Sequence, residues 1–344
     1  MKYRQTRLRI LSFLLVLLLL VPTMAACKSK KIEPFTIPER VEASQEVYTS
    51  GYYDYKKYTD GTAKLMAYHG TESSLVLPDS FDGCRLVEID AGAFAYNTSL
   101  VSIVFNPSLE IIGAYAFVGC TALALMEFGD KLWSVGISAL NDTAWFAAQP
   151  EDFVIIGDNL LINYQGKDLS VQVPDGVRHV CAAFADNLEL KSVYLPDSVV
   201  TVGNAAFSNC LSLVYVKLSP NVVLVDQYAF YGCTDLVIPQ LPAGVEKIGQ
   251  YAFYDNFAMQ AMHLGSSLKT IGRSAFSNCG DLRMVEVPAT LISMDANAFE
   301  DCISLAVVYY GGTEEQFKEI QYLEEENTNF RFKDATKFYN EGTK

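Results

Sequence analysis

Residues 190–210 read LKSVYLPDSVVTVGNAAFSNC, and this stretch decides the fold because the chain repeats it. Moved forward by 23 positions, the pattern returns over residues 213–233 as LVYVKLSPNVVLVDQYAFYGC. The Phe of the Ala-Phe pair recurs at positions 94, 117, 184, 207, 230, 253, 276 and 299. Six of the seven intervals between them are 23 residues. A fixed period of this length identifies a solenoid, in which each coil buries its apolar face against its neighbours.

The one interval that differs runs from Phe117 to Phe184 and is 67 residues, which is two periods of 23 plus 21. Leu140, preceded by an alanine, stands where the first missing Phe belongs. The array therefore continues through the gap, and we interpret residues 141–180 as an insertion.

Within this insertion, residues 152–157 and 159–166 have the composition of two strands around a Gly-Asp turn. A coil modified by a hairpin accounts for the pattern. The alternative is a functional excursion that presents Trp145 and Tyr164 to a ligand, and the residues alone leave it open.

Counted from each Phe, positions +9 and +11 are apolar in nearly every copy, as in Val193 and Leu195. Alternation with a period of two predicts a half-buried strand. One short strand in each coil, stacked in parallel, gives a sheet on one face, while the Ala-Phe column lines the other. The sequence therefore predicts an α/β-type repeat solenoid that is mostly β, with short turns and helical segments.

Two columns of small residues indicate tight contact between coils. The position before each Phe, or before Leu140, is alanine in all nine coils, and a larger side chain there would collide with the adjoining coil. Glycine stands four residues before the Phe at positions 113, 203, 249 and 272, which suits either a positive φ or a close approach of the backbone. We expect the Phe rings to stack into a continuous spine.

Small polar side chains occupy position +3, which holds Asn97, Cys120, Thr143, Asn187, Cys210, Cys233, Asn256, Cys279 and Cys302. This mixture predicts hydrogen bonds to the backbone of a turn inside the stack. The cysteines of the column are therefore expected to be buried thiols. An exported chain could instead form a disulfide between neighbouring coils, Cys210–Cys233 or Cys279–Cys302. Thiolates 23 residues apart form a row and not the cluster that a metal needs, so no metal and no cofactor is expected.

The first residues, MKYRQTRLRILSFLLVLLLLVPTMAAC, combine basic residues, an apolar run and small residues before Cys27. The run is too short for a permanent membrane span and predicts a signal peptide over residues 1–26. The ending MAAC resembles a bacterial lipobox, so Cys27 is the predicted lipidation site, through which the chain would be attached to the membrane. An ordinary signal peptide that leaves a free cysteine is the alternative. Residues 27–50 are polar and have no period, which predicts a lipidated tether.

The predicted solenoid covers residues 51–310. Its first part contains the run YYDYKKY at 52–58, which we interpret as part of the opening strand rather than as a stacking platform for a ligand. A turn signal then precedes a strand expected over 64–68.

Residues 311–344 are expected to form a C-terminal cap, because terminal units of a solenoid must differ from internal ones. Thr313 with Gln316 predicts a capping box at the start of a short helix. Residues 335–339 indicate a last strand. The acidic run at 324–326 is expected to be a solvated loop.

The net charge is −14, and the predicted signal peptide contributes four positive charges to it, so the mature chain would be near −18. This charge argues against nucleic acid and against unaided binding to anionic lipid. Half of the residues are hydrophobic, which excludes disorder for most of the chain.

The unit L-P-x-x-V-x-x-I-G-x-x-A-F-x-x-C resembles the BspA-type leucine-rich repeats of bacterial surface proteins, over about residues 60–310. The tail YYGGTEEQFKEI followed by NFRFKDATKFYN is similar to the closing segment of that family. The resemblance implies an exported surface lipoprotein facing the outside of the cell. Some members of that family are adhesins that bind matrix proteins or other bacteria, while others have no known partner.

We therefore expect a non-catalytic binding module, with an extracellular protein or glycan as its partner. The outward strand positions place Tyr194, Tyr215, Lys217 and Ile238 on one candidate binding face. Ordinary outward residues of a sheet are the alternative reading of this patch, and a passive envelope or spacer protein is the alternative function.

A surface hydrolase is the contrasting class. The chain has only three histidines, at 69, 179 and 263, each in a different repeat context and without an evident nucleophile beside it. No phosphate-binding loop or metal-binding His pair is present in the sequence. We therefore expect no catalytic residues.

Overall fold

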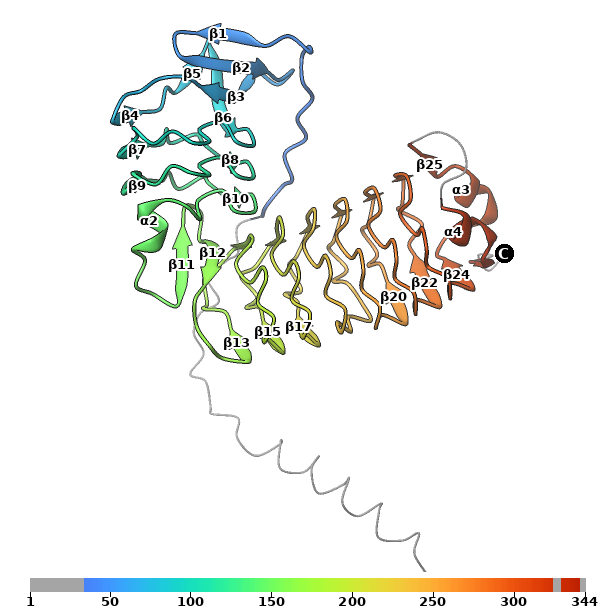
Figure 1. The fold of residues 1–344 in the computed structure, drawn as a ribbon. Coiled ribbons are helices and arrows are strands. Elements are labelled where there is room, and N and C mark those ends of the chain that lie inside the picture. The colour runs from blue at the N-terminus through green and yellow to red at the C-terminus, as the bar shows by residue number, and fades with distance from the viewer. Residues whose placement is uncertain (1–33, 324–328, 341–344) are drawn as a thin grey trace, which may run out of the picture. The chain divides into compact units, whose positions relative to one another are not determined.

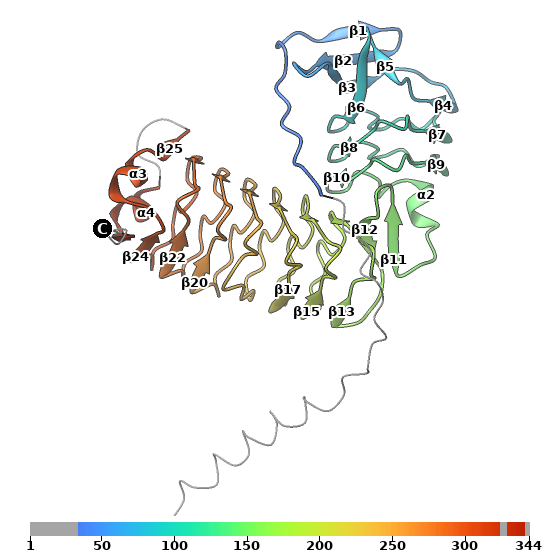
Figure 2. The ribbon, with the colours of Figure 1, turned by 180° about the vertical axis from the view of Figure 1, so that it is seen from behind.

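The structure, a computed structural model, describes residues 34–323 and 329–340. The predicted signal peptide, Cys27 and the acidic run 324–326 lie outside the described residues, so these interpretations stay predictions. Phe35–Lys344 form one compact unit. Within it the chain winds through successive stacked coils, as Figures 1 and 2 show, so the predicted solenoid is confirmed.

The first sheet opens with antiparallel pairings and continues with parallel ones. The first three strands pair antiparallel in chain order, which confirms the predicted opening strands and the turn between them. From the third strand on, one parallel strand is added per coil. This seven-stranded sheet contains β1 (Tyr48–Ser50), β2 (Tyr53–Lys57), β3 (Thr62–Tyr68), β5 (Ser80–Phe81), β6 (Cys84–Ile89), β8 (Ile111–Ile112) and β10 (Ser134–Val135).

A second sheet of nine strands follows the insertion. Its first pair is antiparallel and all later pairs are parallel. Its first two strands are those of the predicted hairpin, and the seven that follow are only two residues long and were not predicted. In chain order the nine strands are β11 (Phe153–Ile156), β12 (Leu160–Tyr164), β14 (His179–Val180), β16 (Thr201–Val202), β18 (Leu224–Val225), β19 (Lys247–Ile248), β21 (Thr270–Ile271), β23 (Ser293–Met294) and β25 (Gln321–Tyr322).

The strands predicted at +8 to +11 form the strand face, which consists of three separate parallel sheets. One interruption is the insertion, and the other is the coil around residues 237–239, which carries no strand. The first sheet is β4 (Ser74–Val76), β7 (Ser102–Val104) and β9 (Leu125–Glu127). The second is β13 (Ser170–Gln172), β15 (Ser192–Tyr194) and β17 (Tyr215–Lys217). The third is β20 (Ala261–His263), β22 (Met284–Val287), β24 (Val307–Tyr310) and β26 (Thr336–Tyr339).

The insertion contains the predicted hairpin, because β11 and β12 pair antiparallel. A one-turn helix, α2 (Ala144–Ala147), precedes it, with Thr143 as its N-cap. The buried residues form two hydrophobic cores, which meet at the insertion. One core contains buried residues between positions 55 and 162 together with Cys181, and the other contains buried residues between positions 161 and 335. We call the coils up to Leu140 the first stack and those from β12 onward the second stack.

The phenylalanines form the predicted spine. Consecutive rings within a stack are stacked, with centroids 4.8–5.2 Å apart and planes no more than 12° from parallel. Tyr68 and Tyr164 begin the two rows, because their rings contact Phe94 and Phe184. The backbone N–H of Tyr164 donates to Ala183, as that of Phe184 donates to Ala206. Tyr164 is thus a core residue, which removes the interpretation that it serves a ligand.

The glycine column reflects close approach and not a positive φ. A Cβ on Gly249 would lie 2.3 Å from the backbone nitrogen of Gln227 in the preceding coil, and at Gly136 the corresponding distance to Ala114 would be 2.4 Å. The alanines before each Phe are buried throughout. Both columns therefore set how closely successive coils stack.

The +3 column forms a ladder of hydrogen bonds between coils. The Sγ atoms of its five cysteines lie 2.9–3.1 Å from the carbonyl oxygen of the Phe in the preceding coil. Asn256 donates in the same way to Phe230, at 2.8 Å. All seven cysteines of the described residues are free, so the expectation of buried thiols in this column is confirmed. Burial raises the pKa values of the Cys233 and Cys279 thiols well above the usual value for cysteine.

The C-terminal cap replaces the next coil. The predicted capping box is present in α3 (Glu314–Lys318), where the Thr313 and Gln316 side chains bond each other's backbone. A second helix, α4 (Phe330–Asp334), was not predicted, and its Phe332 stacks on Phe299 at 4.9 Å. The Asn329 side chain accepts the Phe299 N–H, which in internal coils bonds to a backbone carbonyl. The cap thus gives the last repeat the stacking ring and the hydrogen-bond acceptor that the next coil gives to an internal repeat.

Part of the predicted tether packs on the body. Phe35 contacts Trp133 of the first stack and His179 of the second, with ring centroids 5.1 and 5.0 Å away. Arg40 forms an ion pair with Glu110 at 2.7 Å. An aromatic ring and a paired guanidinium hold this polar segment against the coils from Phe35 onward.

Phe230→Ala is expected to lower the free energy of unfolding by about 3–5 kcal/mol, because it removes a fully buried ring between two stacked neighbours. Chemical unfolding followed by circular dichroism measures the change. Unfolding identical to that of the unmodified chain would contradict the spine.

Cys233→Ala is expected to cost about 1 kcal/mol, because the buried carbonyl of Phe207 loses the thiol as one of its two donors and keeps only the Cys210 N–H. Cys84→Ala is the control, since Cys84 lies outside the column and is only partly buried, and it should change stability by about 0.5 kcal/mol or less. Equal losses in the two variants would show that the thiol ladder adds nothing to stability.

Candidate functional site

The outward side chains of the strand face form one continuous row in the second stack. From Tyr194 to Tyr309 they occupy position +10, and their register partners Gln172 and Phe338 extend the row at its two ends. Apart from Lys217 and Gln240, neighbours in the row are register partners. This outward row consists of Gln172, Tyr194, Lys217, Gln240, His263, Glu286, Tyr309 and Phe338.

Exposed aromatic rings stand toward both ends of the row. Tyr194 is 36% exposed and contacts the ring of Tyr215, which is 44% exposed, at 6.0 Å. Tyr309 is 42% exposed and stacks on Phe338 at 5.1 Å. Neighbouring strands lie about 4.8 Å apart, so the five steps from Tyr194 to Tyr309 cover about 24 Å. Between them stand polar and charged side chains.

The prediction that Ile238 faces outward is wrong. Ile238 is 3% exposed and belongs to the core of the second stack. Pro239 occupies +9, where other coils place an inward Val or Met, and its nitrogen has no hydrogen to donate to a ladder. No strand forms in this coil, and Ile238 turns inward while Val237 and Gln240 are exposed.

Where this strand is missing, a hollow lies between β17 and residues 237–243, and Figure 1 draws no arrow on the strand face between β17 and β20. This hollow has a volume of about 520 Å³, and an adjoining hollow along β20, β22 and β24 has about 430 Å³. Both are lined by Gln240, Leu241 and Ala243, so they form one feature, which we call the strand-end groove. Tyr215 and Lys217 lie at one end of the groove and Tyr309 at the other.

The groove carries charges of both signs. Lys217 supplies a cation, while Glu286 supplies a carboxylate that lies 2.5 Å from Nδ1 of His263. Sites that bind ligands commonly combine apolar walls with a few polar groups that fix orientation. An elongated feature with aromatic ends and a polar centre suits an extended ligand that lies across several coils.

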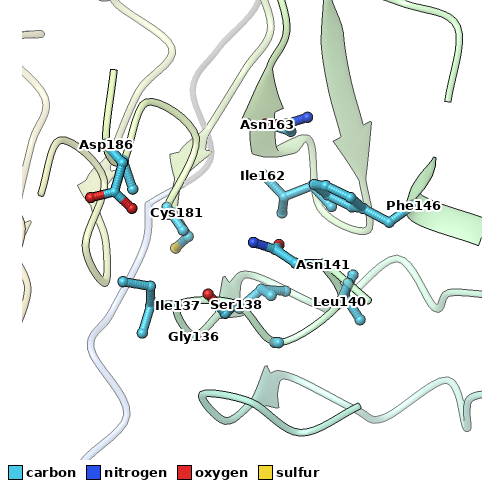
Figure 3. A pocket seen from close by; sticks show the side chains of 14 residues that line it. Gly136, Ile137, Ser138, Leu140, Asn141, Phe146, Ile162, Asn163, Cys181 and Asp186 are labelled. Carbon is cyan, nitrogen blue, oxygen red and sulfur yellow. The ribbon is translucent and has the colours of Figure 1, made fainter. Parts of the chain in front are cut away.

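A smaller cavity lies at the boundary between the stacks (Figure 3). Its lining comes from residues 135–141 of the last coil of the first stack, from the insertion, and from the turn that holds Cys181 and Asp186. Its volume is about 100 Å³, well below that of ligand sites. Burial raises the pKa of the Cys181 thiol to about 12, which makes it a poor nucleophile. We do not assign a function to this cavity.

Each histidine lies beside a carboxylate. His69 is 2.8 Å from Asp54, and the His263–Glu286 pair belongs to the groove. His179 contacts Thr201 at 2.9 Å and Asp158 at 3.3 Å, but its imidazole and Thr201 are fully buried. Burial also lowers the pKa of His179. Phe35 and Trp133 pack over its ring, so this hydroxyl-imidazole-carboxylate series is a structural contact under the N-terminal segment.

Within the described ranges no group of three or more His, Cys, Asp and Glu side chains could hold a metal ion. Nor does any helix in residues 34–323 and 329–340 have the length and apolarity to cross a membrane. The strand-end groove with the outward row is the candidate site, because it combines exposed aromatic rings with charged side chains of both signs. It contains Tyr215, Lys217 and, through the row, Tyr194, whereas Ile238 lies beneath it in the core. The sequence analysis missed Phe338 and the groove itself.

The profile of the family described as "BspA type Leucine rich repeat region" matches six copies, over residues 86–166 and 181–306. This is more than half of the chain. The chain therefore belongs to the BspA-type leucine-rich repeat family. A search of the curated proteins finds no match.

Several solved structures are similar. A leucine-rich cell surface protein from Faecalibacterium prausnitzii is 20% identical, with 81% of this chain and 98% of that chain covered and a TM-score of 0.38. A leucine-rich repeat protein from Bacteroides ovatus is 23% identical, with 73% and 66% covered and a TM-score of 0.40. The pneumococcal vaccine antigen PcpA is 14% identical, with 82% and 99% covered and a TM-score of 0.42. At these values the likenesses carry no argument about function.

Ile238→Lys is expected to lower the free energy of unfolding by about 3–5 kcal/mol, because it places a charge in the core without a partner. Val237→Lys, at the exposed neighbouring position, should change it by about 0.5 kcal/mol or less. Urea unfolding of the two variants measures both. The reverse order of stabilities would restore the outward placement of Ile238.

Proposed function

We propose that this chain is an exported, lipid-anchored protein of the outer cell surface that binds an extracellular protein or glycan without catalysis. The strand-end groove and the outward row form its binding site. The observation that carries the proposal is the arrangement of this site: exposed aromatic pairs about 24 Å apart with Lys217, Gln240, His263 and Glu286 between them.

The composition of the site supports a binding role. Tyrosine is enriched among the residues that carry binding energy at interfaces, because its ring is large and rigid and its hydroxyl can form a hydrogen bond. The rings of Tyr194 and Tyr215 are exposed, whereas the inward-facing positions of the same strands are buried. The apolar residues Val214 and Val237 are exposed next to Tyr215 and extend this surface.

The anchor belongs to the same proposal. Cys27 would carry the lipid, and the net charge of −14 suits a chain that is held at a membrane by acyl groups and not by charge. Adhesion to matrix proteins or to other cells is the role that follows from a surface location and an exposed binding site. Family membership supports this role and does not identify the partner.

The test is a binding screen of the full-length chain, in detergent, against matrix proteins, glycans and whole cells. Saturable binding to one of them is expected. A variant with Tyr194→Ala, Tyr215→Ala and Lys217→Ala should weaken it at least about tenfold, because these side chains line one end of the site.

Leu125→Ala with Glu127→Ala is the matched control, since both residues are exposed on the strand face of the first stack. This control should bind like the unmodified chain. Loss of binding in the control alone would move the site to the strand face of the first stack, and the absence of any saturable partner would favour a spacer protein.

A further inference from the structure

Four half-buried tyrosines form a second cluster, away from the strand face. They belong to two consecutive coils and flank Phe230 and Phe253 at positions −2 and +1. Tyr228 stacks on Tyr251 and Tyr231 on Tyr254, each pair with ring centroids 5.2 Å apart and planes within 9° of parallel. Edge-to-face contacts join the two pairs at 5.8 and 5.7 Å. We call Tyr228, Tyr231, Tyr251 and Tyr254 the tyrosine patch.

The repeat does not require these rings. In the preceding coil the same two positions hold Ala205 and Ser208, and in the following coil they hold Ser274 and Ser277. Small residues on either side fit the same backbone. Aromatic rings in these two coils therefore form a partly exposed surface, which the neighbouring coils of the second stack do not continue.

The backbone makes tyrosine a costly choice at one of the two positions. Tyr228 has φ of 58° and Tyr251 of 55°, in the left-handed region. Asn297 adopts the same conformation in a later coil with φ of 58°. Asparagine and glycine accept this conformation more readily than a bulky residue does. The left-handed φ recurs at this position in the neighbouring coils, at Ala205 and Ser274, so the side chain and not the backbone distinguishes the patch.

Carboxylates lie on one side of the patch. Asp255 follows Tyr254 directly, and Asp301 is exposed two coils further on. Burial, then the charge of Asp255 and also that of Asp301, raise the pKa of the Tyr254 hydroxyl. On the other side of the patch Gln227 and Gln250 bond each other at 2.7 Å, and Arg273 holds the same position in the next coil, where its backbone carbonyl accepts the Tyr251 N–H. Tyrosine ring faces beside carboxylates attract a cation and repel an anion.

We propose that the tyrosine patch binds an arginine-containing, net-basic segment of a partner protein. Arginine fits better than lysine because the planar guanidinium can lie on a tyrosine ring while its N–H groups reach a carboxylate such as that of Asp255. The chain carries a net charge of −14, which brings a basic partner closer and excludes nucleic acid and anionic polysaccharide.

This inference is independent of the proposed function. The patch belongs to the turns around the Phe column, at positions −2 and +1, whereas the strand-end groove is lined by residues from position +7 onward. Either site can be removed without touching the other.

The test uses the full-length chain in detergent and a fluorescein-labelled peptide of Arg-Gly-Ser repeats, with fluorescence anisotropy as the readout. The same peptide with citrulline in place of arginine is the neutral probe. The arginine peptide should bind, more weakly as salt is raised, and the citrulline peptide should bind at least about tenfold less tightly.

The variant carries Tyr228→Ala, Tyr231→Ser, Tyr251→Ser and Tyr254→Ser, which introduces the residues of the neighbouring coils and so preserves the fold. It should lose affinity for the arginine peptide by about tenfold or more. Its circular dichroism spectrum and its binding through the strand-end groove should be unchanged.

Tyr52→Ser with Tyr96→Ser is the control, because both tyrosines are highly exposed elsewhere on the chain. It should bind the arginine peptide normally, as should the Tyr194, Tyr215 and Lys217 variant. Equal binding of the arginine and citrulline peptides would overturn the proposal, as would unchanged affinity in the four-tyrosine variant. A neutral oligosaccharide or a proline-rich peptide that binds only when the four tyrosines are present would also overturn it and would reassign the patch.

Discussion

The contact between one coil and the next is the constraint on which the whole structure depends. Three columns make this contact: a Phe ring stacks on the next ring, a +3 side chain donates to the Phe carbonyl of the coil before it, and glycine lets the backbones approach. All three act at the same spacing, so a change in any one would alter the other two. This coupling explains why the sequence keeps a strict period of 23 residues.

Whatever repeats with this period could be predicted, and what does not repeat could not. The spine, the buried thiols and the hairpin were readable because each follows from a column or from its interruption. Tyr68, Tyr164 and Phe332 extend the spine from segments that lack the Ala-Phe pair, so counting from the sequence could not find them. The two-residue strands of the nine-stranded sheet are too short to show an alternation.

The candidate site divides in the same way. Tyr194, Tyr215 and Lys217 stand where the alternation placed them, because their coils form regular strands. Ile238 does not, because Pro239 prevents the strand on which the count relied. The proline was visible in the sequence, and the groove that it opens was not. The tyrosine patch had a signal as well, since tyrosine replaces Ala or Ser at two turn positions, but only the stacked rings show that these residues form one surface.

Phe35 determines how the molecule bears mechanical load. A force applied to the residues before Phe35 would act first on the contacts of its ring with Trp133 and His179. These contacts lie at the boundary of the two stacks and not at the end of the array. The first elements to resist it are this ring and the ion pair of Arg40 with Glu110. The coils that carry the strand-end groove come later in the chain. If the contacts of Phe35 and Arg40 break under force, the stacking of those coils stays intact.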